Sequence, residues 1–253
     1  MTKLQITVIQ LDNYGPWTVT PEPRPEPELQ ILQAKAYAYF QAKFWKLGGL
    51  VFQTRQDNLI GVTNGISLEQ HESIARGFAR EFPLTASMGV GIGEKAYEAQ
   101  VNATLALQSA GSSRSPERKG VVVGKILGKL RDSWVEIAHA DINHSTLFTD
   151  TKPIYDTHVL IQRTYQELAS QLLREGALTF YMGGDNFMAI TNGLGEDRMI
   201  EIFARIKRDL GVELKAGIGG AKKPVEAAHL ASKALQEIRL GKNKSIIIRK
   251  TTE

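Results

Sequence analysis

Four aspartates stand where strand-like segments of the sequence end or turn, and carboxylates at such positions can bind a metal ion. Asp57 and Asp185 lie 128 positions apart (185 − 57 = 128), and Asp12 and Asp141 precede them in the same order. Two carboxylates held close together repel each other unless a cation or a proton lies between them. Oxygen ligands with few histidines nearby suit Mg²⁺, which completes its shell with water and substrate phosphates. The aspartates therefore predict magnesium sites, although Asp is also an ordinary turn residue.

Two glycines precede one of these aspartates. Gly183 and Gly184 come directly before Asp185, and glycines let a phosphate approach the backbone closely. A hairpin that merely needs positive φ is the alternative explanation. The first copy has Arg55 and Gln56 at these positions, so the two copies cannot bind a phosphate alike. We expect the second copy to hold the main triphosphate and metal site, with the first copy degenerate or auxiliary.

A histidine stands two residues before one aspartate. His139 precedes Asp141, and the alternation of side chains along a strand puts both on one face of the sheet. Histidine can carry protons near neutral pH, so His139 is a candidate catalytic residue. The alternative is a strand histidine whose hydrogen bonds are satisfied within the fold.

The elements that must position these residues occur twice, at a spacing near 130. Hydrophobic periodicity and turn residues predict strand, helix, strand, strand, helix, strand and helix in the first copy. These elements cover 4–11, 29–47, 50–54, 59–63, 68–82, 84–92 and 96–108. The second copy repeats the order, with matching segments at 134–140, 155–175, 177–182, 187–191, 214–219 and 225–235 and a closing strand at 245–249. A repeat at a fixed period indicates a duplication.

The polar run GSSRSPERKG, at 111–120, separates the two copies. We assign residues 1–110 to a first domain, 111–132 to a linker with a short helix at 121–130, and 133–253 to a second domain. The βαββαβ order in each domain predicts an α+β fold of the ferredoxin-like or palm type. Such a fold has an antiparallel sheet with helices on one face. In that fold the first strand ends beside the hairpin of the second and third strands. Asp12 is therefore expected to face Asp57, and Asp141 to face Asp185.

Composition narrows the chemistry. The 253 residues contain no cysteine, which excludes disulfides, thiolate zinc sites and a cysteine nucleophile. The net charge of +4, with basic residues gathered at 114–131 and 239–250, suits a small anionic substrate and gives no argument for nucleic acid. These basic segments are solvated surface in the simpler interpretation and attract a polyanion in the other. No stretch approaches the roughly 20 apolar residues that span a bilayer, so we expect a cytoplasmic protein without a membrane contact.

Several phrases resemble known families. GGDNF, at 183–187, resembles the signature hairpin of GGDEF diguanylate cyclases with Asn186 in place of the usual glutamate, and ADIN, at 140–143, resembles their first metal-bearing strand end. The tandem arrangement, the opening ITVIQLDNYGPWTVTPEPRPE and the phrases QDNLIGVTNG, IAHADIN, GGDNFMAITNG and LKAGIGG resemble archaeal GTP cyclohydrolase III over essentially the whole chain.

This resemblance implies an enzyme that hydrolyses GTP to 2-amino-5-formylamino-6-ribosylamino-4(3H)-pyrimidinone 5′-monophosphate, releases phosphate and feeds flavin and deazaflavin biosynthesis. It also implies Mg²⁺ and stimulation by K⁺ or another monovalent cation. The residues that match are Asp141 and Asp185 for the metal, Gly183, Gly184 and Asn186 for phosphate, and Asp12 for the metal in the first copy, with Asp57, Asn13 and Asn143 auxiliary.

Two other functions stay open. A nucleotidyl cyclase of the class III or GGDEF kind could use the same fold, although Asn186 removes a carboxylate and argues against cyclic dinucleotide synthesis. A GTP-binding module without catalysis is the other, although its relatives lose the metal aspartates, and here all four remain. Because palm enzymes often place sites where palms meet, we also expect a homo-oligomer.

Overall fold

The computed structural model describes residues 2–128, 130–243 and 245–252. The chain divides into two compact units. The first unit contains residues 1–94 and 98–133, and the second contains 95–97 and 134–253. The segment 111–132 therefore packs as part of the first unit.

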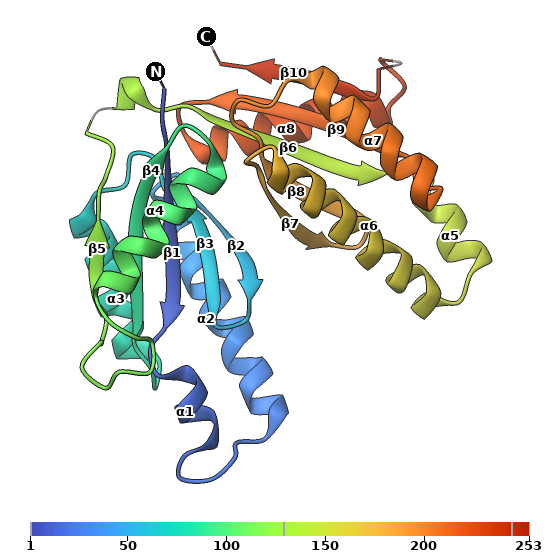
Figure 1. The fold of residues 1–253 in the computed structure, drawn as a ribbon. Coiled ribbons are helices and arrows are strands. Elements are labelled where there is room, and N and C mark those ends of the chain that lie inside the picture. The colour runs from blue at the N-terminus through green and yellow to red at the C-terminus, as the bar shows by residue number, and fades with distance from the viewer. Residues whose placement is uncertain (1, 129, 244, 253) are drawn as a thin grey trace. The chain divides into compact units, whose positions relative to one another are not determined.

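The first unit is built on a five-stranded sheet in the order β2-β3-β1-β4-β5 (Figure 1). Its four main strands are antiparallel, and β5 pairs in parallel with β4. The strands are β1 (Leu4–Leu11), β2 (Leu50–Arg55), β3 (Asn58–Val62), β4 (Ala86–Gly93) and β5 (Val122–Gly124), and the helices are α1 (Tyr14–Val19), α2 (Glu26–Lys46), α3 (Leu68–Glu81) and α4 (Ala96–Ser109).

The second unit repeats this plan with the order β7-β8-β6-β9-β10. The parallel partner is β10, alongside β9, which confirms the closing strand. The strands are β6 (Val135–Ile142), β7 (Leu178–Gly183), β8 (Asn186–Ile190), β9 (Leu214–Ala221) and β10 (Ile247–Thr251), and the helices are α5 (Ser145–Thr151), α6 (Ile154–Arg174), α7 (Glu196–Leu210) and α8 (Pro224–Arg239). The α+β fold and the tandem βαββαβ order are thus as predicted.

One predicted element is wrong. A short helix was expected over 121–130, and the structure has β5 at Val122–Gly124 and a 3₁₀ turn, η1, at Leu130–Asp132. The run of three valines at 121–123 favours an extended conformation, because β-branched side chains fit a pleated surface. Met88 N–H donates to the Val121 carbonyl at 2.7 Å, which begins the parallel pairing.

Alternation along the strands places the core on one face of each sheet. In the second unit Ala138, Ala140 and Ile142 of β6 are buried with side chains of α6 and α7 such as Leu168 and Phe203. This is the period of two that buries one strand face against helices.

The opposite face of each sheet is also covered, so the expectation of helices on one face alone is wrong. Gly217 and Gly219 of β9 lie so close to α8 that an added Cβ would stand 2.1 Å from the Ala231 carbonyl oxygen and 1.9 Å from that of Ala227. Glycine is required there because any side chain would push the helix away. This close approach brings the end of α8 to the end of β6. No helix in the described part of the chain is both long and apolar enough to cross a bilayer.

Candidate active site

The candidate site lies in the second unit, where β6 ends beside the turn between β7 and β8. Asp141 pairs across the sheet with Asn186, and Ile142 N–H donates to the Asp185 carbonyl at 3.3 Å. The structure therefore brings Asp141 and Asp185 to the same edge of the sheet, although they lie 44 positions apart in sequence (185 − 141 = 44).

The carboxylate of Asp141 is buried and unevenly satisfied. Its Oδ2 lies 3.0 Å from Arg239 Nε and 3.4 Å from Lys215 Nζ. Its Oδ1 is buried and has no hydrogen-bond partner among the described residues. A buried carboxylate oxygen without a partner is costly, so this oxygen is the open position of the site.

Asn186 connects the two aspartates. Its Nδ2 donates to Asp185 Oδ1 at 2.9 Å, and its Oδ1 accepts from Arg239 Nη2 at 3.0 Å. His139 Nε2 lies 3.1 Å from the same Oδ1, and because a carbonyl oxygen can only accept, Nε2 carries the proton. The amide predicted to bind phosphate is thus occupied in orienting Asp185.

His139 is neutral in this network. Burial lowers the pKa of His139, and the hydrogen bond with Asn186 opposes that effect only in part. Since Nε2 holds the proton, Nδ1 accepts from Ser232 Oγ at 3.1 Å. Both ring nitrogens are thus engaged in hydrogen bonds, one with Asn186 and one with Ser232 of α8, and the catalytic role of His139 stays a prediction.

The turn before Asp185 requires glycine. Gly183 has φ of 98° and Gly184 has φ of 59°, a region that other residues rarely adopt. An added Cβ at Gly183 would meet nothing within 4 Å, so the space beside the turn is open. The residues of the corresponding turn in the first unit, Arg55 to Asn58, are not among the described residues with positive φ. This turn therefore has a different backbone conformation.

A pocket of about 480 Å³ is lined by Lys215 and Arg239, the two cations that contact the Asp141 carboxylate. Its volume lies within the range of roughly 300–1,000 Å³ that is usual for small-molecule sites. Its lining contains the cations Lys207, Lys215 and Arg239 and apolar side chains such as Phe203. It also contains Glu213, which forms an ion pair with Lys207 at 2.7 Å. Lys215 Nζ also donates to Asn143 Oδ1 at 3.3 Å. Three cations against one carboxylate, beside apolar side chains, suit an anion that carries a ring.

The donor set fits a magnesium ion. Within the described residues no group of three or more His, Asp or Glu side chains gathers as a metal cage. Mg²⁺ does not need such a cage, since it commonly uses one or two carboxylates and takes its other ligands from water and phosphates. Asp141 Oδ1, without a partner, and the partly buried Asp185 provide that pair.

The residues that occupy equivalent positions in the two units differ from those that the sequence spacing predicted. Gln10 pairs with Asn58 in the first sheet as Asp141 pairs with Asn186 in the second. The first strands are therefore offset by 131 (141 − 10 = 131), while the hairpins are offset by 128 (186 − 58 = 128). The connection after the first strand explains this difference, because it covers 12–25 in one unit and 143–153 in the other.

The matching of Asp12 with Asp141 is consequently wrong. Asp12 N–H donates to the Thr85 carbonyl as Asn143 N–H donates to that of Glu213, so Asp12 is the counterpart of Asn143. The position of Asp141 belongs to Gln10 in the first unit, which is neutral.

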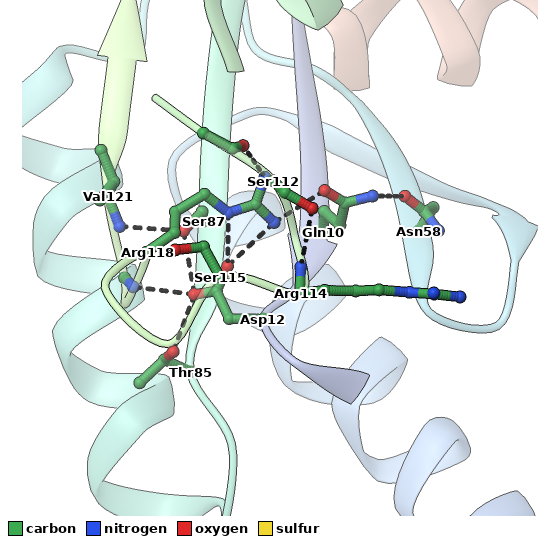
Figure 2. A network of polar contacts seen from close by, with 12 residues as sticks. Gln10, Asp12, Asn58, Thr85, Ser87, Ser112, Arg114, Ser115, Arg118 and Val121 are labelled. Carbon is green, nitrogen blue, oxygen red and sulfur yellow. Dashed lines mark hydrogen bonds and ion pairs between the residues drawn. The ribbon is translucent and has the colours of Figure 1, made fainter. Parts of the chain in front are cut away.

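Asp12 is enclosed in a saturated network, which Figure 2 shows. Its side chain forms a buried ion pair with Arg118 at 3.0 Å. The other oxygen, Oδ2, accepts hydrogen bonds from Thr85 Oγ1, Ser87 Oγ and Gly120 N–H. Both carboxylate oxygens of Asp12 are engaged, so Asp12 has no free oxygen for a metal ion.

The remaining candidates in the first unit are also accounted for. The Asp57 carboxylate is 3.3 Å from the exposed guanidinium of Arg55, and the Asp57 carbonyl accepts from Leu11 N–H. Asn13 adopts left-handed φ of 53° just before α1, and its N–H donates to the Ser113 carbonyl. The structure places the Asp12 side chain against Arg118 and that of Asp57 against Arg55, so it does not pair the two carboxylates.

Four further residues are in contact with these sites and were not singled out from the sequence. They are Arg118, Lys215, Ser232 and Arg239. Arg118 and Arg239 each belong to one of the two basic segments, and there the charge pattern was the available signal. The sequence contained no signal for Lys215 and Ser232, because only the tertiary packing brings these residues to their partners.

The fold and the site together define a tandem α+β protein of two βαββαβ units, with one carboxylate at the end of the central strand of the second unit and another in the neighbouring hairpin turn. The family model of GTP cyclohydrolase III matches residues 4–251, and the chain belongs to this family.

Curated relatives agree over nearly the whole length. A GTP cyclohydrolase III of Methanothermobacter thermautotrophicus is 49% identical over 94% of this chain and 95% of its own. One of Methanocaldococcus jannaschii is 46% identical over 93% of this chain and 88% of its own. Among solved structures, the GGDEF domain of PA1120 from Pseudomonas aeruginosa is similar over 49% of this chain and 88% of that chain, with 20% identity and a TM-score of 0.40.

Proposed function

We propose that the second unit hydrolyses GTP to 2-amino-5-formylamino-6-ribosylamino-4(3H)-pyrimidinone 5′-monophosphate. One water adds at C8 of guanine and the bond from C8 to N9 breaks, so C8 stays on N7 as the formyl group. One further water is consumed for each of the two phosphoanhydride bonds, which releases two phosphates. The observation that carries this proposal is the open Oδ1 of Asp141 beside Asp185, in a chain of the GTP cyclohydrolase III family.

Asp141 and Asp185 would hold Mg²⁺ in this proposal. The ion, when bound, supplies Lewis-acid stabilisation of charge that develops on the substrate. A monovalent cation such as K⁺ is proposed as an activator, as the family resemblance implies. The product would then serve flavin and deazaflavin biosynthesis.

Side chains of the chain itself bind and orient the substrate. Arg239 and Lys215 in the lining of the pocket attract the triphosphate. The open space at Gly183 lets a phosphate approach the backbone. Asn186, held by His139, keeps Asp185 in place, and such supporting contacts hold a site within the geometry that catalysis needs.

Product analysis tests this function. The purified chain is incubated with GTP labelled with carbon-13 at C8, in MgCl₂ and KCl, and the products are identified by mass spectrometry with an assay for free phosphate. We expect a formylaminopyrimidine monophosphate that retains the label, with two phosphates released for each GTP.

Other products would contradict the proposal. Labelled formate in place of a labelled nucleotide would mean that C8 leaves the ring system. Cyclic GMP or a cyclic dinucleotide would make the chain a nucleotidyl cyclase. Unchanged GTP that nevertheless binds would make it a binding module.

A further inference from the structure

A second pocket lies in the first unit, at the place that corresponds to the pocket of the second unit. Its volume is about 390 Å³, and its lining includes Asp12 and Asn13. The pocket of the second unit includes Asn143 and His144, which hold the same places after the first strand. Both copies of the duplicated fold have thus kept a cavity at the end of the central strand.

The floor of this pocket is closed and electrically neutral. Arg118 Nη2 lies 3.0 Å from Asp12 Oδ1 and donates to Gln10 Oε1 at 2.7 Å, while Gln10 Nε2 donates to Asn58 Oδ1 at 2.9 Å (Figure 2). The side chains of Asp12 and Arg118 are each 2% exposed. In the described residues, no member of this network is among the buried side chains that have an atom without a partner. A divalent cation therefore finds no free carboxylate oxygen here.

The walls carry aromatic surface and one cation. Trp17 and Phe82 are half-buried and line the pocket together with Ser115 and Lys119. Lys119 is exposed, and within the part of the chain that the structure describes it makes no ion pair, apart from a longer-range attraction with Glu117. Arg24 lies over one face of Trp17, 3.9 Å from its centroid, and Phe78 stacks on Phe82, so the edges and uncovered faces of Trp17 and Phe82 are what a planar ring can contact. A cation with no ion-pair partner attracts an anionic group.

We propose that the pocket of the first unit binds a purine nucleotide without a divalent cation. The neutral ion pair of Asp12 and Arg118 forms the floor of the pocket, where the second unit is proposed to hold a metal ion. Lys119 binds the phosphate of the nucleotide, and the aromatic side chains contact its purine ring. Stacking of a base on an aromatic side chain contributes roughly 1–3 kcal/mol in nucleic-acid sites. The choice of a guanine nucleotide rests on the proposed function of the second unit.

Fluorine NMR on the full chain tests this site. The chain has three tryptophans, and 5-fluorotryptophan labelling gives each a separate signal, with that of Trp17 assigned from a Trp17→Phe variant. GMP is titrated in EDTA, which removes divalent cations. We expect the Trp17 signal to shift saturably and those of Trp45 and Trp134 to stay in place.

A matched pair of lysine variants makes the result specific. Lys119→Ala should raise the Kd of GMP by about fivefold or more, because a charge-assisted contact is lost. Lys125→Ala removes the same charge from outside the pocket lining and should leave the Kd unchanged. A Trp17 signal that does not move at millimolar GMP, or that moves equally in both variants, would overturn the proposal.

The outcome is independent of turnover, because EDTA removes the metal on which the proposed hydrolysis depends. Binding that appears only with Mg²⁺ and is lost in Asp141→Asn would belong to the second unit and would also overturn the proposal. If the chain failed to hydrolyse GTP, the Trp17 titration with GMP would still test nucleotide binding in the first unit.

Discussion

Asp141 is the residue on which the site depends most. Asp141→Asn replaces the partnerless carboxylate oxygen by a neutral amide and weakens the contacts with Arg239 and Lys215. We expect kcat for GTP to fall at least about a hundredfold, comparable to the loss of a charge-stabilising group in other active sites. Steady-state phosphate release measures this, and activity within a few fold of the wild type would remove Asp141 from the mechanism.

Asp57→Asn is the matched change in the first unit. Asp57 occupies the hairpin position that Asp185 has in the second unit, but in the described part of the chain its ion pair is with the exposed Arg55. Exposed pairs contribute about 0–1 kcal/mol, so both stability and kcat should stay near the wild type. A loss of turnover as large as that of Asp141→Asn would show that both hairpins take part in catalysis.

Asp12 is expected to act on stability. Asp12→Asn leaves the guanidinium of Arg118 buried without a counter-charge. Breaking one partner of a buried ion pair costs about 3–5 kcal/mol, which urea denaturation would detect as a lower midpoint. An unchanged midpoint would show that the guanidinium finds another partner or reaches water.

The buried His71 and the partly buried His139 give stability a pH dependence. Burial lowers the pKa of His71 and of His139 below the ordinary 6.5, so the unfolded chain binds protons more readily than the folded chain. The free energy of unfolding should therefore decrease as the pH falls below about 6.5. Denaturation at pH 7.5 and 5.5 measures the slope. His71→Gln should reduce it and the exposed His158→Gln should not, whereas a stability that rises towards pH 5.5 would contradict the assignment.

Some residues of the candidate site could be predicted from the sequence, and others could not. The turn glycines and Asp185 could be predicted because they are local, with side-chain type and turn chemistry set by neighbouring residues. Asp12 was matched with the wrong residue because the connection after the first strand is longer in the first unit. The carboxylate partners Arg239 and Lys215 come from other elements, and their contacts arise only from the packing of α8 and β9 on β6.

At the scale of elements, the contact between α8 and β9 sets the position of Arg239 and Ser232. Gly219→Ala would place a Cβ 1.9 Å from the Ala227 carbonyl oxygen, so the helix must move. Overpacking of this kind costs about 1–3 kcal/mol, and we expect both a lower denaturation midpoint and a lower kcat. Gly15→Ala is the control, because an added Cβ there meets nothing within 4 Å. Equal behaviour of the two variants would contradict the packing account.

The strand and helix order could be predicted because periodicity and turn residues are local signals. The last helix of each unit was predicted, but its place on the second face of the sheet was not, since the alternating glycines that admit it were not interpreted as a packing surface. The fifth strand in the first unit was missed because three valines next to a polar run were assigned to a linker.

At the scale of the whole molecule, an oligomer is expected. Leu147, Ile154 and Tyr155 in the segment from α5 to α6 are 60%, 85% and 75% exposed. Apolar side chains that gather at the surface are typical of protein contacts. Light scattering should give a mass above the 28.0 kDa of one chain, and Tyr155→Ser with Ile154→Ser should lower it. A mass of one chain for the unaltered protein would contradict this expectation.

The division of labour between the two units is the central claim, and metal binding tests it most directly. Mn²⁺ replaces Mg²⁺ as a spectroscopic probe, and bound Mn²⁺ is measured by electron paramagnetic resonance with a non-hydrolysable GTP analogue. The account predicts that Asp141→Asn and Asp185→Asn lose the bound Mn²⁺ and that Asp57→Asn retains it. Retention of Mn²⁺ by Asp141→Asn together with its loss in Asp57→Asn would place the metal in the first unit and contradict the account.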